Sequence, residues 1–233
     1  MVKRVPDVAD EVPDDANMPA WRQRAVSRSL NAARSRAERR VQRFLDAAFE
    51  LIDDKGTTEF TIQEVIDRSQ QSLRGFYQYF DGKTELLLAL FEETIREATE
   101  DLRSIVDPGA APIDRLRAFT IRLHEWCDPS EKPRKRGTHN RRPIIEFSVQ
   151  LAVDHPEQVK AAMAPISHQM LQLIEAAQAA GAVDVRDARR AAGLLQQTVM
   201  YSWFGNRLAD SVRSRLTAEE TWEFCLHGLG APR

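Results

Sequence analysis

Residues 61–83 read TIQEVIDRSQQSLRGFYQYFDGK, and in this stretch two short helix patterns meet at a polar turn. Thr61 and Glu64 form a capping box, in which the threonine oxygen and the glutamate carboxylate satisfy free amides at a helix start. Three apolar residues follow at the spacing of one buried helix side: Ile62, Val65 and Ile66. This spacing predicts a helix that begins at about Ile62 and ends at the polar residues 69–71.

A second short helix is predicted directly after the turn. Ser72 suits its N-cap, because a serine oxygen accepts a hydrogen bond from a free amide at a helix start. Phe76 and Phe80, spaced i and i+4, are expected to pack inward. The side chains left facing out are Leu73, Arg74, Gly75, Tyr77 and Gln78. Two helices joined in this way are typical of a DNA-binding helix-turn-helix.

Helical periodicity continues on both sides of this motif. An amphipathic helix is predicted over residues 41–55, with a possible extension backwards through the preceding arginines, and Gly56 suits its end. A long helix is predicted from Lys83 to about Val106, and at 1.5 Å per residue it would measure about 36 Å. Further helices are predicted over residues 112–126, 143–153, 156–180, 188–206 and 217–227. Because no segment shows sustained strand-like alternation, the fold class is all-α.

The order Thr61-x3-Val65-x11-Tyr77-x-Tyr79-Phe80-x2-Lys83 resembles the N-terminal domain of the tetracycline-repressor (TetR) family of bacterial regulators, over roughly residues 41–91. At the turn the family usually has a glycine, whereas this chain has Gln70, where left-handed backbone dihedrals would cost about 1 kcal/mol. The resemblance implies a three-helix helix-turn-helix domain joined by a long helix to a helical-bundle C-terminal domain for ligand sensing and dimerisation. The corresponding segments are 1–34 for a tail and arginine-rich arm, 35–82 for the DNA-binding domain and 83–233 for the C-terminal domain.

The resemblance also implies a function. We expect a sequence-specific DNA-binding transcriptional regulator, by the family's usual mode a repressor, which binds a palindromic operator on double-stranded DNA as a homodimer. An unknown small apolar or amphipathic ligand, bound in the C-terminal domain, is expected to release it. Neither a cofactor nor a metal is expected.

By match to the family pattern, one set of residues is expected near DNA phosphates: Thr61, Ser72, Tyr77, Tyr79 and Lys83. A second set is expected to face base edges: Leu73, Arg74, Gly75 and Gln78. Arg74 can pair with guanine and Gln78 with adenine, while Leu73 can cover a thymine methyl group. The alternatives are core packing for the two tyrosines and a solvated charge for Arg74.

For the C-terminal domain, aromatic and methionine side chains are candidates to line an apolar ligand site. These are Phe119, Leu123, Trp126, Phe147, Met163, Met170, Tyr201 and Trp203. The family resemblance places the dimer contact on the last two helices, where the candidates are Ala188, Ala191, Ala192, Leu195, Val199, Ser202, Trp222, Cys225, Leu226 and Leu229. Both sets could equally be the core of a single chain.

Composition is that of a globular protein of 233 residues, 42% hydrophobic and 29% charged. No apolar run approaches the roughly 18 residues of a membrane span, and no apolar leader is visible, so we expect a cytoplasmic protein. The two cysteines and five scattered histidines have no spacing typical of a disulfide framework or a zinc site. Motifs of hydrolases, nucleotide-binding enzymes and metalloenzymes are missing, which argues against an enzyme.

Charge is unevenly distributed along the N-terminal part of the chain. Between Trp21 and Arg43 there is one acid, Glu38, against eight arginines: Arg22, Arg24, Arg28, Arg34, Arg36, Arg39, Arg40 and Arg43. Residues 1–20 are instead acidic and proline-containing, which is typical of a disordered tail. The arginine run could follow a DNA backbone or enter a minor groove. Alternatively it is a solvated basic face.

Two other functions remain open from the sequence. One is a DNA-binding protein without an inducer, either architectural or controlled by a protein partner, with the basic loop at residues 132–142 as a docking surface or an extra DNA surface. The other, less favoured, is a helical enzyme that retains the DNA-binding domain by descent. Sequence-selective binding would separate a regulator from an architectural protein, and turnover of a bound compound would identify an enzyme.

Overall fold

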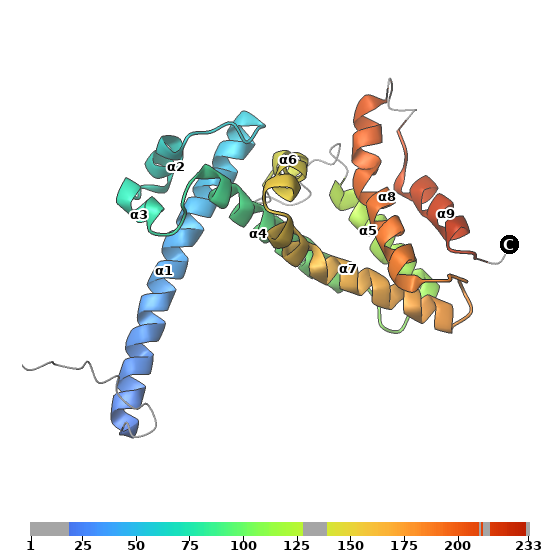
Figure 1. Cartoon of the computed structure of the whole chain (residues 1–233), viewed down its shortest axis with the longest axis horizontal. Helices are drawn as coiled ribbons and strands as arrows, with labels where there is room; N and C mark the ends of the chain where they lie inside the picture. Colours follow the sequence, from blue (N-terminus) through green and yellow to red (C-terminus); the bar gives the residue numbers. More distant parts are fainter. Residues whose placement is uncertain (1–18, 128–138, 210, 212–214, 232–233) are drawn as a thin grey trace, which may run out of the picture. The chain divides into compact units, whose positions relative to one another are not determined.

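The structure is a computed structural model that describes residues 19–127, 139–209, 211 and 215–231. Within these ranges the chain forms nine α-helices and no strand, which confirms the all-α prediction (Figure 1). Of the basic loop predicted at residues 132–142, the part up to residue 138 lies outside the described residues. The predicted acidic tail lies outside them up to residue 18.

Three helices contribute to the predicted DNA-binding domain: α1 (Ala20–Lys55), α2 (Ile62–Ser69) and α3 (Leu73–Tyr77). Helix α1 ends at Gly56, whose φ of 67° suits a residue without a Cβ and whose amide donates to the Ile52 carbonyl at 2.8 Å. The extension of α1 through the arginines is thus present. Helices α2 and α3 begin where their predicted caps, Thr61 and Ser72, place them.

Six further helices form the rest of the chain: α4 (Lys83–Ser104), α5 (Pro112–Cys127), α6 (Arg142–Asp154), α7 (Pro156–Ala179), α8 (Ala188–Leu208) and α9 (Ala218–Gly228). Helices α5, α7 and α8 pack against one another, and α9 packs on α5 and α8 (Figure 1). Helix α4 contacts α5, α6 and α7. The second predicted capping box, Thr217 with Glu220, is present at the start of α9.

The chain divides into two compact units between Arg43 and Phe44, within α1. The predicted boundary after residue 34 lies nine residues earlier in the same helix. The second unit holds both the end of α1 and all the remaining helices, so the predicted division between residues 82 and 83 lies inside it and stays a prediction. The helical residues 20–43 belong to the first unit and are named the basic arm.

An aromatic cluster forms the core of the DNA-binding domain. Phe44 of α1 makes edge-to-face contacts with Phe76 of α3 and with Phe80, at centroid distances of 5.6 and 6.1 Å. Phe44 and Phe76 are fully buried, and burial of a phenylalanine side chain contributes about 1.5–3 kcal/mol. The three rings therefore fix the short α3, which has too few residues to be stable alone.

The turn between α2 and α3 depends on one strained residue. Gln70 has a φ of 54° and a ψ of 37°, and it is the one non-glycine residue with positive φ among the described residues. This left-handed conformation lets the Gln70 amide donate to the Ile66 carbonyl, and the Gln71 amide donates to the same oxygen at 3.3 Å. The geometry predicted from the family pattern is therefore present without the glycine that would adopt it freely.

We predict that Gln70→Gly raises the free energy of unfolding by about 1 kcal/mol, because glycine reaches this conformation without the clash between Cβ and the carbonyl. Chemical denaturation monitored by circular dichroism measures the change. Gln71→Gly is the matched control, since Gln71 has no positive φ; glycine there adds freedom to the unfolded chain and removes the hydrogen bond from Gln71 Nε2 to the Gln70 carbonyl, so it should destabilise. Equal destabilisation by both substitutions would contradict the account of Gln70.

Candidate nucleic-acid interface

The start of α2 is fixed by a complete capping box. The Glu64 amide donates to Thr61 Oγ1 at 3.2 Å, and the Thr61 amide donates to Glu64 Oε2 at 2.8 Å. Lys55 Nζ lies 2.7 Å from the other carboxylate oxygen, Oε1. The Lys55 hydrogen bond, together with those from Thr61, lowers the pKa of Glu64 to about 2. The carboxylate therefore stays charged, and the box stays intact, at any pH near neutrality.

Charged side chains also join α2 to the end of α1. Arg68 of α2 lies 3.3 Å from Glu50 and 2.8 Å from Asp54, both on α1. These hydrogen bonds raise the pKa of the Arg68 guanidinium above its ordinary value. The pairs are exposed to solvent, which screens their attraction, so they add little to stability. The pairs orient α2 against α1. They also direct the Arg68 guanidinium to carboxylates of the same domain rather than outward.

Helix α3 presents the surface that the sequence predicts. Its N-cap is Ser72, whose Oγ accepts the Gly75 amide at 3.0 Å. Leu73 is 51% exposed and Tyr77 53% exposed, and the side chains of Arg74 and Gln78 are exposed as well. The structure therefore brings together on one short helix the base-facing set expected from the family pattern. Helix α3 ends after five residues, but the Gln78 backbone keeps helical dihedrals.

Gly75 allows both the cap and the close approach of α3 to a partner. A Cβ at this position would lie 3.1 Å from Ser72 Oγ, inside ordinary van der Waals contact. Any larger residue would therefore press on the hydroxyl that caps the helix. The sequence predicted Gly75 as a point of close approach, and the structure adds this internal reason for a glycine.

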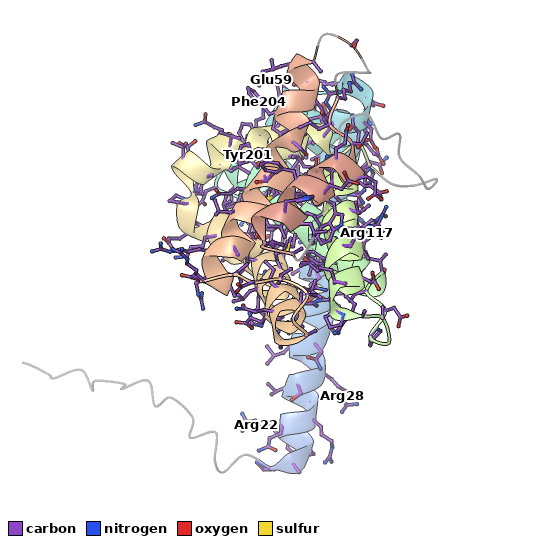
Figure 2. All side chains as sticks on the ribbon, turned by 90° about the vertical axis from the view of Figure 1, so that its right-hand side faces the viewer. Arg22, Arg28, Glu59, Arg117, Tyr201 and Phe204 are labelled. Atoms are coloured by element: carbon purple, nitrogen blue, oxygen red, sulfur yellow. The ribbon has the colours of Figure 1, made fainter. Side chains whose placement is uncertain are left out.

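The residues expected near phosphates differ in how free they are. Tyr77 is exposed, whereas Tyr79 is half-buried, so part of the Tyr79 ring packs in the domain. Thr61 uses its hydroxyl in the capping box. Lys83, at the first turn of α4, has its ammonium 5.0 Å from the centre of the Phe60 ring and 4.0 Å from Glu59, which Figure 2 labels. Lys83 therefore shares its charge with a neighbouring carboxylate.

The candidate ligand-binding residues differ in burial. Phe119, Leu123 and Met170 are buried in the core, and four others are half-buried: Trp126, Phe147, Met163 and Trp203. Tyr201 is 57% exposed on α8, so its expected place in an interior lining is not supported (Figure 2). Trp126 has a specific role, because its Nε1 donates to Asp101 Oδ2 at 2.7 Å and its ring lies 4.8 Å from the Arg141 guanidinium carbon.

The candidate dimer residues lie mostly inside the single chain. Seven are buried: Ala192, Leu195, Val199, Ser202, Trp222, Cys225 and Leu229. The other three, Ala188, Ala191 and Leu226, are half-buried. The alternative of a monomer core therefore describes these stripes better.

A different apolar set is exposed on the same two helices: Leu194, Tyr201, Phe204, Leu208 and Phe224. Figure 2 labels Tyr201 and Phe204 of this set. Leu194, Tyr201 and Leu208 recur at seven-residue intervals on α8, so they share one helix face. This surface was not predicted, although the seven-residue interval is present in the sequence. Helix α8 has this second apolar stripe in addition to the buried one with Leu195 and Val199, and a second stripe indicates a second contact surface.

Neither cysteine forms a disulfide, and both are buried. Burial raises the pKa of the Cys225 thiol to about 11. Among the described residues, no three His, Cys, Asp or Glu side chains are arranged to hold a metal ion. None of the described helices is long and apolar enough to span a membrane.

Comparison with known proteins locates the resemblance in the DNA-binding domain. Residues 44–90 match the family model described as bacterial regulatory proteins, tetR family. The HTH-type transcriptional regulator BetI of Brucella suis biovar 1 (strain 1330) is 29% identical over 80 residues, which are 34% of this chain and 40% of that protein. The chain thus matches less than half the length of this curated relative. The resemblance inferred from residues 61–83 is confirmed.

Solved structures share the fold over most of the chain. A TetR-family transcriptional regulator from Pectobacterium atrosepticum matches with a TM-score of 0.67 and 18% identity, over 86% of this chain and 99% of that one. RolR, solved in complex with the ligand resorcinol, matches with a TM-score of 0.64 and 16% identity, over 84% and 90%. At such identities the likeness establishes the fold: an N-terminal helix-turn-helix domain and a helical C-terminal domain.

We predict that Arg74→Ala and Lys83→Ala affect DNA binding differently. Loss of Arg74 removes a contact to a base edge, so discrimination at one base pair should fall by about 1–3 kcal/mol. Loss of Lys83 removes a phosphate contact, so all duplexes should bind more weakly and the dependence on salt should flatten by about one unit of slope. Fluorescence anisotropy with single-base variants of a bound duplex measures both effects.

Arg103→Ala is the control for these two variants, because Arg103 is exposed near the end of α4 and its loss changes the net charge equally. It should leave both readouts unchanged. Uniform losses from Arg74→Ala and Lys83→Ala alike would contradict the assignment of separate roles.

Proposed function

We propose that the chain, whose residues 44–90 match the model of the tetR family of bacterial regulatory proteins, represses transcription as a ligand-responsive homodimer in the cytoplasm. The observation that supports this most directly is the α3 surface. Arg74 and Gln78 are exposed there beside Leu73, and within the described residues Arg74 takes part in no ion pair. Its guanidinium is therefore available to pair with a guanine.

The small size of α3, the proposed recognition helix, supports a homodimer. Helix α3 has five residues and covers only a few base pairs, whereas two copies spaced by about 34–36 Å reach successive major grooves on one side of the duplex. The exposed stripe of α8, with Leu194, Tyr201 and Leu208, together with Phe224 of α9, is the surface we propose for the contact. Exposed apolar side chains grouped in this way favour burial against a second copy.

We predict that the purified protein selects a palindromic consensus from a pool of random duplexes and sediments as a dimer at micromolar concentration. Tyr201→Asp places a charge in the proposed contact, so it should shift the protein towards monomer and weaken binding to the full palindrome by tenfold or more, by order of magnitude. Analytical ultracentrifugation and anisotropy measure these effects.

Val153→Asp is the matched control, because Val153 is 72% exposed on α6, outside the stripe, and gains the same charge. It should leave the dimer and its operator affinity intact. A wild-type protein that is monomeric at micromolar concentration, or a consensus without a dyad, would count against the homodimer.

Ligand control requires contacts that carry a change in the C-terminal domain to the DNA-binding domain. The His139 ring stacks on Phe49 of α1 at a centroid distance of 4.8 Å, and its Nδ1 lies 2.7 Å from Asp53 Oδ2. The Asn140 amide donates to Asp53 Oδ1 at 2.5 Å. Two residues at the start of the α6 segment therefore hold the end of α1.

The next residue holds the C-terminal domain. Arg141 pairs with Glu97 of α4 and lies over Trp126 of α5, while Trp126 and Arg122 both bind Asp101 of α4. Residues 139–141 thus link α1 to α4 and α5 through the side chains of His139 and Arg141 and the backbone amide of Asn140. A ligand that favours another arrangement of α5 and α6 would shift the population of DNA-binding conformations through this link.

We predict that a ligand found by thermal-shift screening both stabilises the protein and releases it from DNA. At a concentration 100 times its dissociation constant, binding to the folded state alone adds about 2.7 kcal/mol to the free energy of unfolding. Phenolic compounds are a suitable first panel, because the structural neighbour RolR was solved with resorcinol. Stabilisation without release, or no stabilisation across broad panels, would contradict ligand control.

A further inference from the structure

The DNA-binding domain carries the wrong net charge to hold DNA phosphates by itself. Residues 44–90 contain four bases against nine acids, a formal balance of −5. Three of the four bases are directed to carboxylates within the domain: Lys55 to Glu64, Arg68 to Glu50 and Asp54, and Lys83 to Glu59. Affinity for duplex DNA depends on neutralising phosphates with cations. Lys83 is the one base of this segment that we expect to reach a phosphate, so most of the cations for this purpose must come from elsewhere.

The basic arm has the opposite balance. From Trp21 to Arg43 eight arginines face one acid, a formal balance of +7, and all eight arginine side chains are exposed. Figure 2 shows the side chains of Arg22 and Arg28 projecting from the ribbon. The formal charges of the arm and of residues 44–90 add up to a positive value. The arm therefore reverses the net charge of the N-terminal part of the chain.

The arginines lie on one side of the arm helix. At about 100° per residue, seven of the eight fall within an arc of about 160°. Arg34 is outside this arc, and it is also the arginine that pairs with Glu38, at 2.7 Å. Within the described residues, the seven on the arc form no ion pair. The single acid of the arm thus neutralises the one arginine that would not share a surface with the others.

Like charges crowd this surface in the free protein. Three arginine pairs stand four residues apart, Arg24 with Arg28, Arg36 with Arg40, and Arg39 with Arg43. Such pairs destabilise a helix by a few tenths of a kcal/mol each. A polyanion that runs beside the helix relieves this repulsion, and duplex DNA carries one charge per 1.7 Å of its axis.

We propose that the basic arm is a second DNA-binding surface, which holds phosphates while α3 reads bases; this inference rests on the proposed function. The arm is continuous with the DNA-binding domain at Phe44, and its 24 residues measure about 36 Å. In whichever direction it leaves Phe44, it stays within about one duplex turn of the DNA-binding domain. The arm therefore supplies the charge that the acidic domain lacks.

An anionic membrane is the competing partner for a basic helix. Membrane-surface helices insert large apolar side chains such as Trp, Phe and Leu opposite their charges. The side of the arm away from the arginine arc has three large apolar side chains, Val26, Leu30 and Val41, and the one tryptophan of the arm, Trp21, falls within the arc itself. This side is too small for stable insertion, so the charges fit a phosphate backbone better than a bilayer.

The test compares wild type with the arm variant Arg28→Gln/Arg36→Gln/Arg39→Gln/Arg40→Gln, both as full chains. Binding to a fluorescent duplex is measured at several salt concentrations. The arm variant should lose about 0.9 from the slope of log K against log salt for each phosphate contact removed, and at least about tenfold in affinity near 0.15 M salt. Its discrimination between the selected duplex and a scrambled one should stay that of wild type, because phosphate contacts carry no sequence information.

A matched pair of single variants tests the face of the arm. Arg40→Gln and Arg34→Gln remove the same charge, but only Arg40 lies on the arc, so only Arg40→Gln should reduce the salt slope. Circular dichroism verifies that the helix persists in each variant. Equal slopes for wild type and the four-residue variant would overturn the inference. So would loss of binding to phosphatidylserine vesicles with an unchanged salt slope on DNA, which would assign the arm to a membrane.

The outcomes separate this inference from the proposed function. The salt slope is measurable on any duplex, so a protein that shows the arm effect without sequence selection would retain this inference and refute the regulator. If wild type selects a sequence but the arm variant has an unchanged salt slope, the regulator is retained and the inference about the arm is refuted.

Discussion

The contact of Phe44 with Phe76 and Phe80 is the constraint on which the rest of the structure depends. Helix α3 is too short to hold its own shape, and its exposed residues are useful only if its buried side is fixed. Phe76 provides that side, and Phe44 fixes it to α1. Because Phe76 fixes α3 on its buried side, the side chains on its exposed side are not needed to hold the helix in place and are free to contact DNA in the proposed function.

Local chemistry explains how much of this the sequence could reveal. The two capping boxes and the Ser72 cap are short-range patterns, so α2, α3 and α9 begin where the residues say. The left-handed turn at Gln70 followed only from the family pattern, since glutamine itself disfavours it. Surfaces were harder: a stripe with Leu195 and Val199 looks the same whether it faces its own chain or a second one, and burial alone separates the two.

Long-range pairs were beyond the sequence altogether. Nothing in the spacing of residues indicates that His139 meets Asp53 and Phe49, or that Arg141 meets Trp126, because each pair is set by how helices pack. By comparison, the difference in net charge between the basic arm and the acidic domain can be counted from the sequence. Its meaning appears only when the structure shows that Lys55, Arg68 and Lys83 are already directed to carboxylates.

The state of Cys225 has a consequence for how the protein responds to its surroundings. With a thiol pKa of about 11, roughly one molecule in ten thousand carries the thiolate at neutral pH. Oxidants and alkylating agents attack that form, so this sulfur behaves as a small hydrocarbon. The Cys225 sulfur is therefore a poor target for oxidation, and what it contributes to α9 is packing.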